Sequence, residues 1–87
     1  MLDRIRQIVA AITQNDVASV STDSNSQNLD GWDSLAQINI IVAIEEEFGV
    51  AFSAEEMHAL NSVKKIVDAL RLVPSLPGWF GQKPSPV

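Results

Sequence analysis

The feature that most constrains the fold is the segment from Ser34 to Phe48, SLAQINIIVAIEEEF, which is apolar around most of a helix. Its apolar side chains cover well over half of the circumference, whereas an ordinary surface helix has an apolar stripe nearer roughly 100° wide. These side chains are Leu35, Ile38, Ile40, Ile41, Val42, Ile44 and Phe48. We therefore predict a central helix over 34–48 that is contacted on several sides and ends at Gly49. Its exposed strip is expected to contain Ala36, Asn39, Ala43, Glu46 and Glu47.

A helix and a long connection are predicted before this central element. Apolar residues at helical spacing predict the helix over residues 2–14. They are Leu2, Ile5, Ile8, Val9 and Ile12. The polar residues 15–33 then form a loop of a length that is uncommon in a small domain and is often functional. We expect Val17, Val20 and Leu29 to hold this loop against the core.

Two more helices are predicted after the central one. Ser53 and Glu56 have the spacing of a capping box, and Phe52 and Met57 that of a hydrophobic staple, so a short helix begins at FSAEEM. Leu60 completes its apolar side. The last helix is capped by Asn61 or Ser62 and cannot continue far past Pro74. Its apolar stripe comprises Val63, Ile66, Val67 and Leu70.

The predicted fold is all-α, a four-helix bundle with a short third helix, a long first loop and an irregular C-terminal tail. The 87 residues fit one small domain. We assign it to residues 1–73 and treat 74–87 as a flexible tail, because that segment holds all four prolines and two of the four glycines. Trp79 and Phe80 in the tail either dock on the bundle, dock elsewhere or have no role.

Composition excludes several classes of protein. The chain has no cysteine, so it can have neither a disulfide framework nor a thiolate metal site. It lacks a recognisable signal peptide, and no apolar run approaches the roughly 20 residues of a membrane span. We therefore expect a cytoplasmic protein without membrane insertion. The net charge is −5, and no basic residue lies between Arg6 and Lys64. Such a field repels nucleic acid and attracts basic partner surfaces, unless it only maintains solubility.

Two kinds of chemistry are considered and set aside. Asp23, Asn25 and Gln27 begin an EF-hand-like pattern, but Asn28 stands where that loop needs glycine and Ser34 where it needs a bidentate glutamate. A serine hydrolase needs a base beside its nucleophile, and the single histidine, His58, lies in the predicted third helix. We therefore predict neither a metal site nor a catalytic site.

Ser34 has two compatible interpretations. With Gln37 it fits a capping box, although Asp33 is an equally good N-cap for the central helix. A hydroxyl at a helix N-terminus is also exposed at the end of a rigid element. A phosphate attached there would lie near unpaired backbone N–H groups and the positive end of the helix dipole.

From the DSL motif at 33–35 through VAIEEEFGVAFSAEEMHALNSVKKIVDAL at 42–70, the sequence resembles the acyl carrier proteins. The resemblance covers roughly residues 1–72. It implies that Ser34, flanked by Asp33 and Leu35, carries 4'-phosphopantetheine, transferred from coenzyme A by a separate magnesium-dependent transferase. The terminal thiol of that arm would hold an acyl-type group as a thioester. By this resemblance the chain is a carrier phosphoprotein of a biosynthetic pathway and not an enzyme.

The resemblance also concerns partners. Glu45 and Glu46 match positions that are acidic in the family and that partners recognise. The implied partners are the phosphopantetheinyl transferase, enzymes that activate acyl or aminoacyl groups, and enzymes that transfer acyl groups. These enzymes are expected to have basic docking surfaces. The full set of predicted recognition residues is Ala36, Asn39, Ala43, Glu45, Glu46, Glu55 and Glu56. Carriers of the main fatty-acid pathway commonly have acidic residues where this chain has Ala36, Asn39 and His58. Trp32 is more typical of stand-alone carriers of specialised pathways. Both departures favour a specialised pathway for this chain. A monomer is expected. The alternatives are an aminoacyl or peptidyl carrier and an unmodified acidic helical interaction module.

Overall fold

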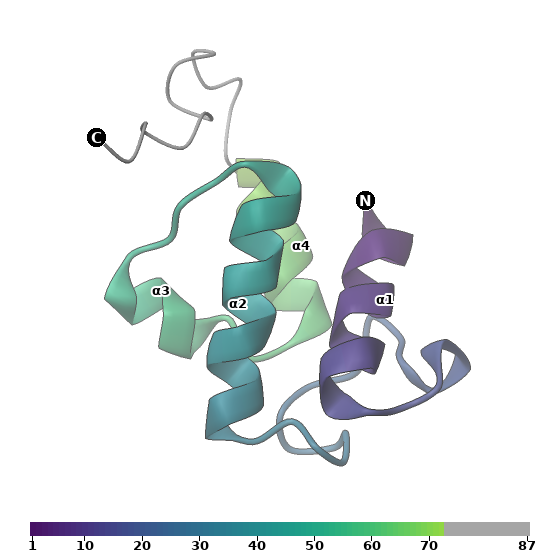
Figure 1. Cartoon of the computed structure of the whole chain (residues 1–87). Coiled ribbons are helices and arrows are strands. Elements are labelled where there is room, and N and C mark those ends of the chain that lie inside the picture. The colour runs from purple at the N-terminus through teal and green to yellow at the C-terminus, as the bar shows by residue number, and fades with distance from the viewer. Residues whose placement is uncertain (73–87) are drawn as a thin grey trace.

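The computed structural model describes residues 1–72 (Figure 1), and the proposed tail at 74–87, with Trp79 and Phe80, lies outside them. The described residues form four α-helices, one short 3-10 helix and no strand. In chain order they are α1 (Leu2–Thr13), η1 (Val17–Ser19), α2 (Ser34–Phe48), α3 (Ala54–Ala59) and α4 (Val63–Leu72). This confirms the predicted all-α, four-helix fold with a short third helix and a long first loop. No helix within residues 1–72 is long and apolar enough to cross a membrane.

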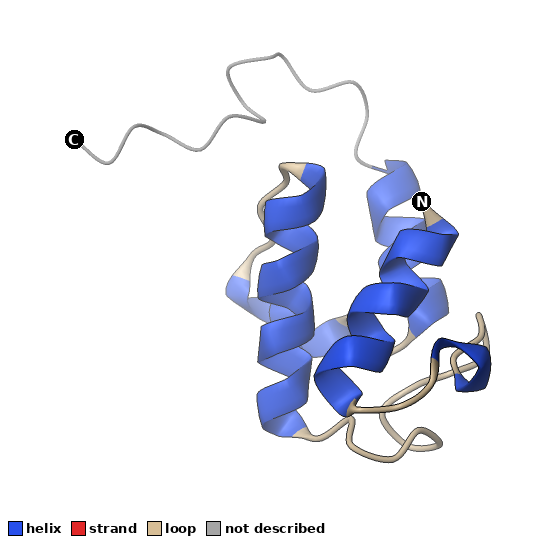
Figure 2. Cartoon of the chain, turned by 45° about the vertical axis from the view of Figure 1, so that its right-hand side comes forward, coloured by secondary structure: helices blue, strands red, loops and turns tan. Residues whose placement is uncertain are grey.

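The core lies around α2, which stands between α1 on one side and α3 on the other, with α4 behind it (Figure 1). Ile40, Ile41 and Ile44 of α2 are fully buried, together with Ile5 of α1 and Ile66 of α4. Figure 2 shows that the end of α1 and the start of α2 lie at the same end of the molecule, where the long loop joins them. The first residues of α2 are therefore supported by both α1 and the loop.

The exposed face of α2 differs from the predicted one. Ala36 is buried and Ala43 is partly buried against the core, whereas Leu35 and Val42, which were expected inside, are 71% and 38% exposed. Asn39, Glu46 and Glu47 are exposed as predicted. The orientation of α2 points Gln37 toward the core. Successive residues of an α-helix are rotated by about 100° around its axis, so the exposed side opposite to Gln37 carries residues 35, 39, 42 and 46.

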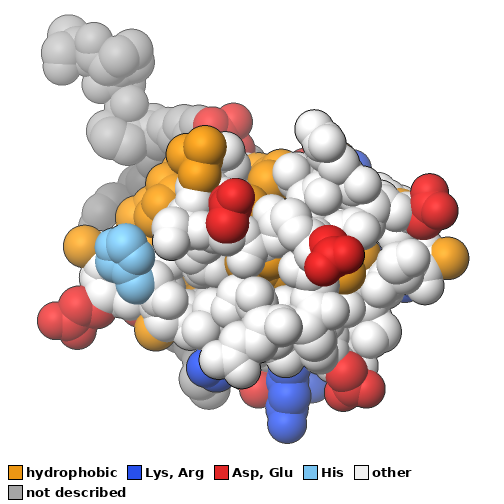
Figure 3. Space-filling model, turned by 90° about the horizontal axis from the view of Figure 1, so that it is seen from below, with side chains coloured by type: hydrophobic (Ala, Val, Ile, Leu, Met, Phe, Trp, Pro, Cys, Tyr) orange, Lys and Arg blue, Asp and Glu red, His pale blue; other side chains and the backbone are white. Residues whose placement is uncertain are grey.

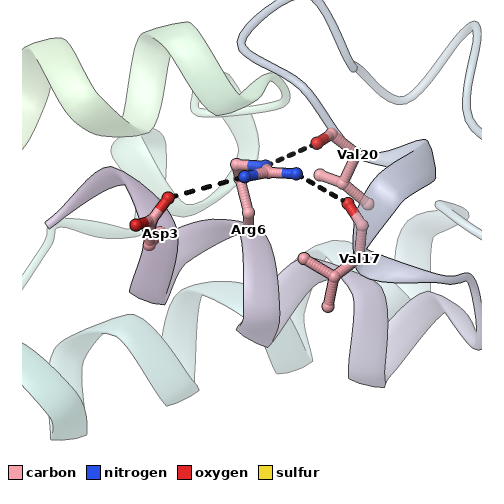
Figure 4. A network of polar contacts seen from close by, with 4 residues as sticks. All are labelled: Asp3, Arg6, Val17 and Val20. Atoms are coloured by element: carbon pink, nitrogen blue, oxygen red, sulfur yellow. Dashed lines mark hydrogen bonds and ion pairs between the residues drawn. The ribbon is translucent and has the colours of Figure 1, made fainter.

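Arg6 holds the first half of the long loop (Figure 4). Its Nε donates to the carbonyl of Val20 at 2.6 Å and its Nη2 to the carbonyl of Val17 at 2.9 Å, while Asp3 lies 3.5 Å from Nη1. The Val20 side chain is buried as predicted, but the Val17 side chain is 41% exposed. Val17 thus anchors the loop through its backbone carbonyl, and the prediction that its side chain does so is wrong.

The second half of the loop is fixed to two other elements. Ser26 N–H donates to the Asn61 carbonyl and Val63 N–H donates to the Ser24 carbonyl, both at 3.0 Å, which joins the loop to the α3–α4 connection. Gly31 has a φ of +85°, and a Cβ there would come within 2.5 Å of the carbonyl oxygen of Thr13. Only glycine therefore allows the chain to pass so close to the end of α1.

The local signals for helix boundaries hold in the structure. Ser53 and Glu56 form the predicted capping box, with both bonds present. The Ser62 hydroxyl accepts a hydrogen bond from Lys65 N–H at 3.0 Å, so of the two predicted caps of α4 the serine is the one used. α1 ends one residue earlier than predicted, because Gln14 adopts a left-handed conformation with φ of 60°.

Candidate functional site

Ser34 is the first residue of α2 and is exposed. The N-cap is Asp33, whose carboxylate accepts the Ala36 N–H at 2.8 Å. Of the two caps that the sequence allows, Asp33 is therefore the one present, and the capping box of Ser34 with Gln37 does not form. Among the hydrogen bonds between residues 1–72, none uses the hydroxyl of Ser34. This hydroxyl is thus available for chemistry at the end of a rigid helix.

A buried hydrogen-bond network holds the start of α2 in place. Trp32 is buried, and its Nε1–H donates to Oε1 of Gln37 at 2.7 Å. The Gln37 amide Nε2 donates in turn to the carbonyls of Met57 at 2.8 Å and Leu60 at 2.9 Å. Met57 lies in the last turn of α3 and Leu60 is its C-cap, at the end where helices leave carbonyls without intrahelical partners. Gln37 therefore joins the loop before the site, α2 and the end of α3.

Sequence reasoning missed this network, although the spacing contains a signal for it. Trp32 precedes the N-cap and Gln37 is the fourth helical residue, which are the two positions that a hydrophobic staple occupies. Here an indole N–H bonded to an amide replaces the usual apolar pair. The loop before Trp32 is fixed as well, because Asn15 Nδ2 donates to the carbonyl of Asp30 at 2.7 Å.

A pocket of about 330 Å³ opens beside Ser34, between the start of α2, α3 and the long loop. Its lining includes Ser26 of the loop, His58 of α3 and Asn61 of the α3–α4 connection, with Trp32, Asp33 and Gln37. His58, which the sequence places in the third helix without a functional role, is exposed, and the fold brings it to the same pocket as Ser34. Seen from this end, the molecule presents mostly uncharged surface, with a histidine and separate acidic and basic side chains (Figure 3).

The acidic residues predicted for recognition have different surroundings. Glu45 Oε2 accepts the Phe52 N–H at 2.8 Å, and Glu56 accepts the Ser53 N–H at 3.0 Å within the capping box. These two carboxylates are therefore bound to the backbone. Glu46 and Glu55 are exposed. Within residues 1–72, no group of three or more His, Asp or Glu side chains is arranged to hold a metal ion.

Comparison with known proteins gives a consistent result. The family model described as "Phosphopantetheine attachment site" matches residues 3–70. The chain is 31% identical over 67 residues to acyl carrier protein 3 of Ralstonia nicotianae, with 77% of each chain covered. It is 30% identical over 67 residues to acyl carrier protein 2 of Pseudomonas aeruginosa, covering 77% of this chain and 85% of the relative. It is 33% identical over 66 residues to the mitochondrial acyl carrier protein 2 of Arabidopsis thaliana and spans 52% of that protein's length.

Proposed function

The chain belongs to the acyl carrier protein family, and we propose that the hydroxyl oxygen of Ser34 is the atom to which its 4'-phosphopantetheine is attached. One observation carries the proposal. The Ser34 side chain is exposed at the first position of α2 and is not needed as a cap, because Asp33 performs that role. A substituent on Ser34 therefore removes no hydrogen bond between the described residues.

The attachment is a substitution at phosphorus. The Ser34 oxygen forms a bond to the phosphorus that carries the pantetheine part of coenzyme A. The bond from that phosphorus to the adenosine bisphosphate breaks, and the hydroxyl proton passes to a base of the transferase or to water. A separate transferase is expected because the chain belongs to a family whose members receive the arm from such an enzyme. The chain contains no cysteine, so the thiol that holds the cargo belongs to the arm.

We propose further that the cargo is an acyl-type group held as a thioester and delivered to partner enzymes, with an aminoacyl group as the alternative. The exposed strip of α2 supports delivery through that helix. It starts beside the attachment point with Leu35 and Asn39 and continues through Val42 to Glu46. This strip replaces Ala36 and Ala43, which the sequence placed at the surface. Its neutral, partly apolar character near Ser34 favours a specialised pathway over housekeeping fatty-acid synthesis.

The alternative of an unmodified acidic module finds less support. Such a module would bind a basic partner through Glu45, Glu46, Glu55 and Glu56. Two of these carboxylates, those of Glu45 and Glu56, are already hydrogen-bonded to backbone N–H groups. A third nearby acid, Glu47, pairs with Arg4 at 3.0 Å. The acidic surface is better explained as an aid to the encounter of a carrier with its enzymes.

The attachment site is tested by intact mass spectrometry after incubation with coenzyme A and a broad-specificity phosphopantetheinyl transferase. The wild-type chain should gain the mass of one phosphopantetheinyl group. Ser34→Ala should gain nothing, and the control Ser19→Ala, which removes another exposed serine hydroxyl, should gain one group. Circular dichroism confirms that each variant is folded. A folded Ser34→Ala chain that still gains the group would refute the assignment.

The cargo requires a different measurement. The carrier is isolated from its native cells, its thioester is cleaved with hydroxylamine, and the hydroxamate that is released is identified by mass spectrometry. An acyl cargo gives a hydroxamate without a primary amine, whereas an aminoacyl cargo gives one that reacts with amine-selective reagents. The second result would replace the acyl assignment by the aminoacyl alternative and leave the attachment at Ser34 intact.

A further inference from the structure

Two polar ties join α2 to the segment that contains α3, one near each end of α2. We call the contact between α2 and α3 the seam (Figure 1). In the first turns of α2, the Gln37 amide donates to the carbonyls of Met57 at 2.8 Å and Leu60 at 2.9 Å. In its last turn, Glu45 Oε2 accepts the N–H of Phe52 at 2.8 Å. The two tied residues of α2 lie about 12 Å apart along the helix, so neither end of the seam opens unless a tie breaks.

The Gln37 tie engages the whole amide group of that side chain. Its Nε2 donates to the two carbonyls, and its Oε1 accepts the Nε1–H of Trp32 at 2.7 Å. Gln37 and Trp32 are only 6% and 3% exposed, so a bond that is lost is not simply replaced by a bond to water. A buried donor without a partner opposes a rearrangement by about 5- to 150-fold. Gln37 therefore turns aside only where another interaction compensates for that loss.

The seam between the two ties is filled by side chains of the core. On α2, Ile41 and Ile44 lie within about 40° of the direction of Gln37 around the helix axis, and both are fully buried. Met57 and Leu60 are partly buried against the same core. Among residues 1–72, every buried side-chain nitrogen and oxygen has a hydrogen-bond partner. A group that entered the seam would therefore have to displace packed side chains as well as the Gln37 tie.

The ties affect which cargo can leave water for the seam. An apolar group gains about fourfold for each methylene that becomes buried, or about 60-fold for the three alkyl carbons of a butanoyl group. Trp32 and Gln37 line the pocket beside Ser34, so a group that enters from this side meets the Gln37 tie. The unpaired indole alone opposes entry by up to about 150-fold, and the two freed carbonyls and the displaced side chains oppose it further. Hydroxyl or carboxyl groups on the cargo add the cost of their own burial. A long apolar chain could enter only by breaking the network that holds the start of α2.

We propose that the cargo of this carrier is a short or polar acyl group, of up to about four carbons or bearing hydroxyl, carboxyl or amino groups, that stays in solvent outside the helices. Gln37 is the residue that excludes the cargo from the seam, and Trp32 holds Gln37 in position. This inference rests on the proposed function, because it takes the arm on Ser34 and its thioester as given. It narrows the cargo to one class and assigns two buried residues a role in selecting that class.

The first test measures how accessible the thioester is to hydroxylamine. The chain is loaded with acetyl, butanoyl or hexanoyl pantetheine arms, and each cleavage rate is divided by the rate for the same thioester of free pantetheine. A cargo that spends time in the seam is cleaved more slowly in proportion, because only the exposed form reacts. All three wild-type rates should lie within about twofold of the free thioesters, since the tie opposes burial more than these chains favour it.

Variants show whether the tie is responsible. In Gln37→Leu, which has no bond to break, the hexanoyl thioester should be cleaved at least about tenfold more slowly than the acetyl thioester, relative to the free compounds. Trp32→Phe is the milder second variant, because it removes the buried donor and leaves the bonds to the carbonyls, and it should give weaker protection of the same kind. The control Asn39→Leu, on the exposed face of α2, should match wild type. Circular dichroism identifies the variants that are folded.

The second test identifies the hydroxamate released from the carrier of native cells, which should have at most about four carbons or carry polar groups. An unsubstituted longer chain would overturn the inference. So would a wild-type carrier whose protection rises with chain length, or folded Gln37→Leu and Trp32→Phe chains that both behave like the Asn39→Leu control. Loading is verified first by intact mass, so any of these results in a chain loaded at Ser34 refutes the inference alone. A chain not loaded at Ser34 refutes the proposed function, and the cargo class with it.

Discussion

Replacing Gln37 by leucine should destabilise the fold by about 3 kcal/mol, although the two side chains are similar in size. The change leaves Nε1–H of Trp32 as a buried donor without a partner, which costs about 1–3 kcal/mol. It also removes the bonds to the carbonyls of Met57 and Leu60. These carbonyls lie at a helix end within partly buried surroundings, and their loss adds about 0.5–1 kcal/mol each. The sum is a large fraction of the 5–15 kcal/mol typical of such domains.

The assay is urea unfolding followed by far-ultraviolet circular dichroism, repeated as a thermal scan. A loss of this size should lower Tm by roughly 12–24 °C in a domain of this length. Trp32→Phe removes the indole donor, and a double-mutant cycle with Gln37→Leu should give a coupling energy of about 1–2 kcal/mol. The control Asn39→Leu, on the exposed face of α2, should stay within about 0.5 kcal/mol of wild type. A Gln37→Leu chain as stable as the control, or a cycle without coupling, would refute the structural role of the network.

Three further predictions concern the start and the outer face of α2. Asp33→Ala should cost about 1 kcal/mol through loss of the N-cap, whereas Ser34→Ala should cost less than about 0.5 kcal/mol in the same urea titration; equal costs would contradict the assigned cap. Gly31→Ala should cost about 2–3 kcal/mol, because its positive φ and the close carbonyl at the end of α1 both oppose a side chain, and a stability unchanged in thermal scans would contradict this. In stopped-flow binding to a partner enzyme, Leu35→Glu should shorten the lifetime of the complex at all salt concentrations, while Glu46→Lys should slow association only at low salt. If salt abolished both effects, recognition would be ordinary charge pairing.

The sequence predicts both ends of α2 and the start of α3 well, because the signals for them are local. Asp33, Gly49 and the Ser53–Glu56 pair act within one helical turn of the residues that they cap. The sequence did not predict which face of α2 points outward. Apolar side chains occur all around this helix, so periodicity could not show that Leu35 faces water while Ala36 is buried. The orientation is consistent with the bonds of Gln37 to carbonyls 20 and 23 residues away, which no local pattern reveals.

The same reasoning applies to the loop and the site. Val17 was expected to hold the loop through its apolar side chain. Arg6 instead donates a hydrogen bond to the Val17 carbonyl. Such bonds between a side chain and the backbone follow no sequence periodicity, so the pattern could not predict this one. The sequence places Ser34 at the start of α2 and leaves two possible caps, and only the geometry shows that Asp33 is the one used. That His58 lines the same pocket as Ser34 depends on how α3 crosses the start of α2, and is therefore a property of the fold.

The central claim is that Ser34 is the single point at which the phosphopantetheine arm joins this carrier. Its most direct test is peptide mapping by tandem mass spectrometry of the chain after loading with coenzyme A and a transferase. We predict one phosphopantetheinyl group per chain, found on the peptide that contains Ser34 and lost from that residue on fragmentation. A group located on any other serine or threonine, or a folded chain that accepts none, would contradict the account.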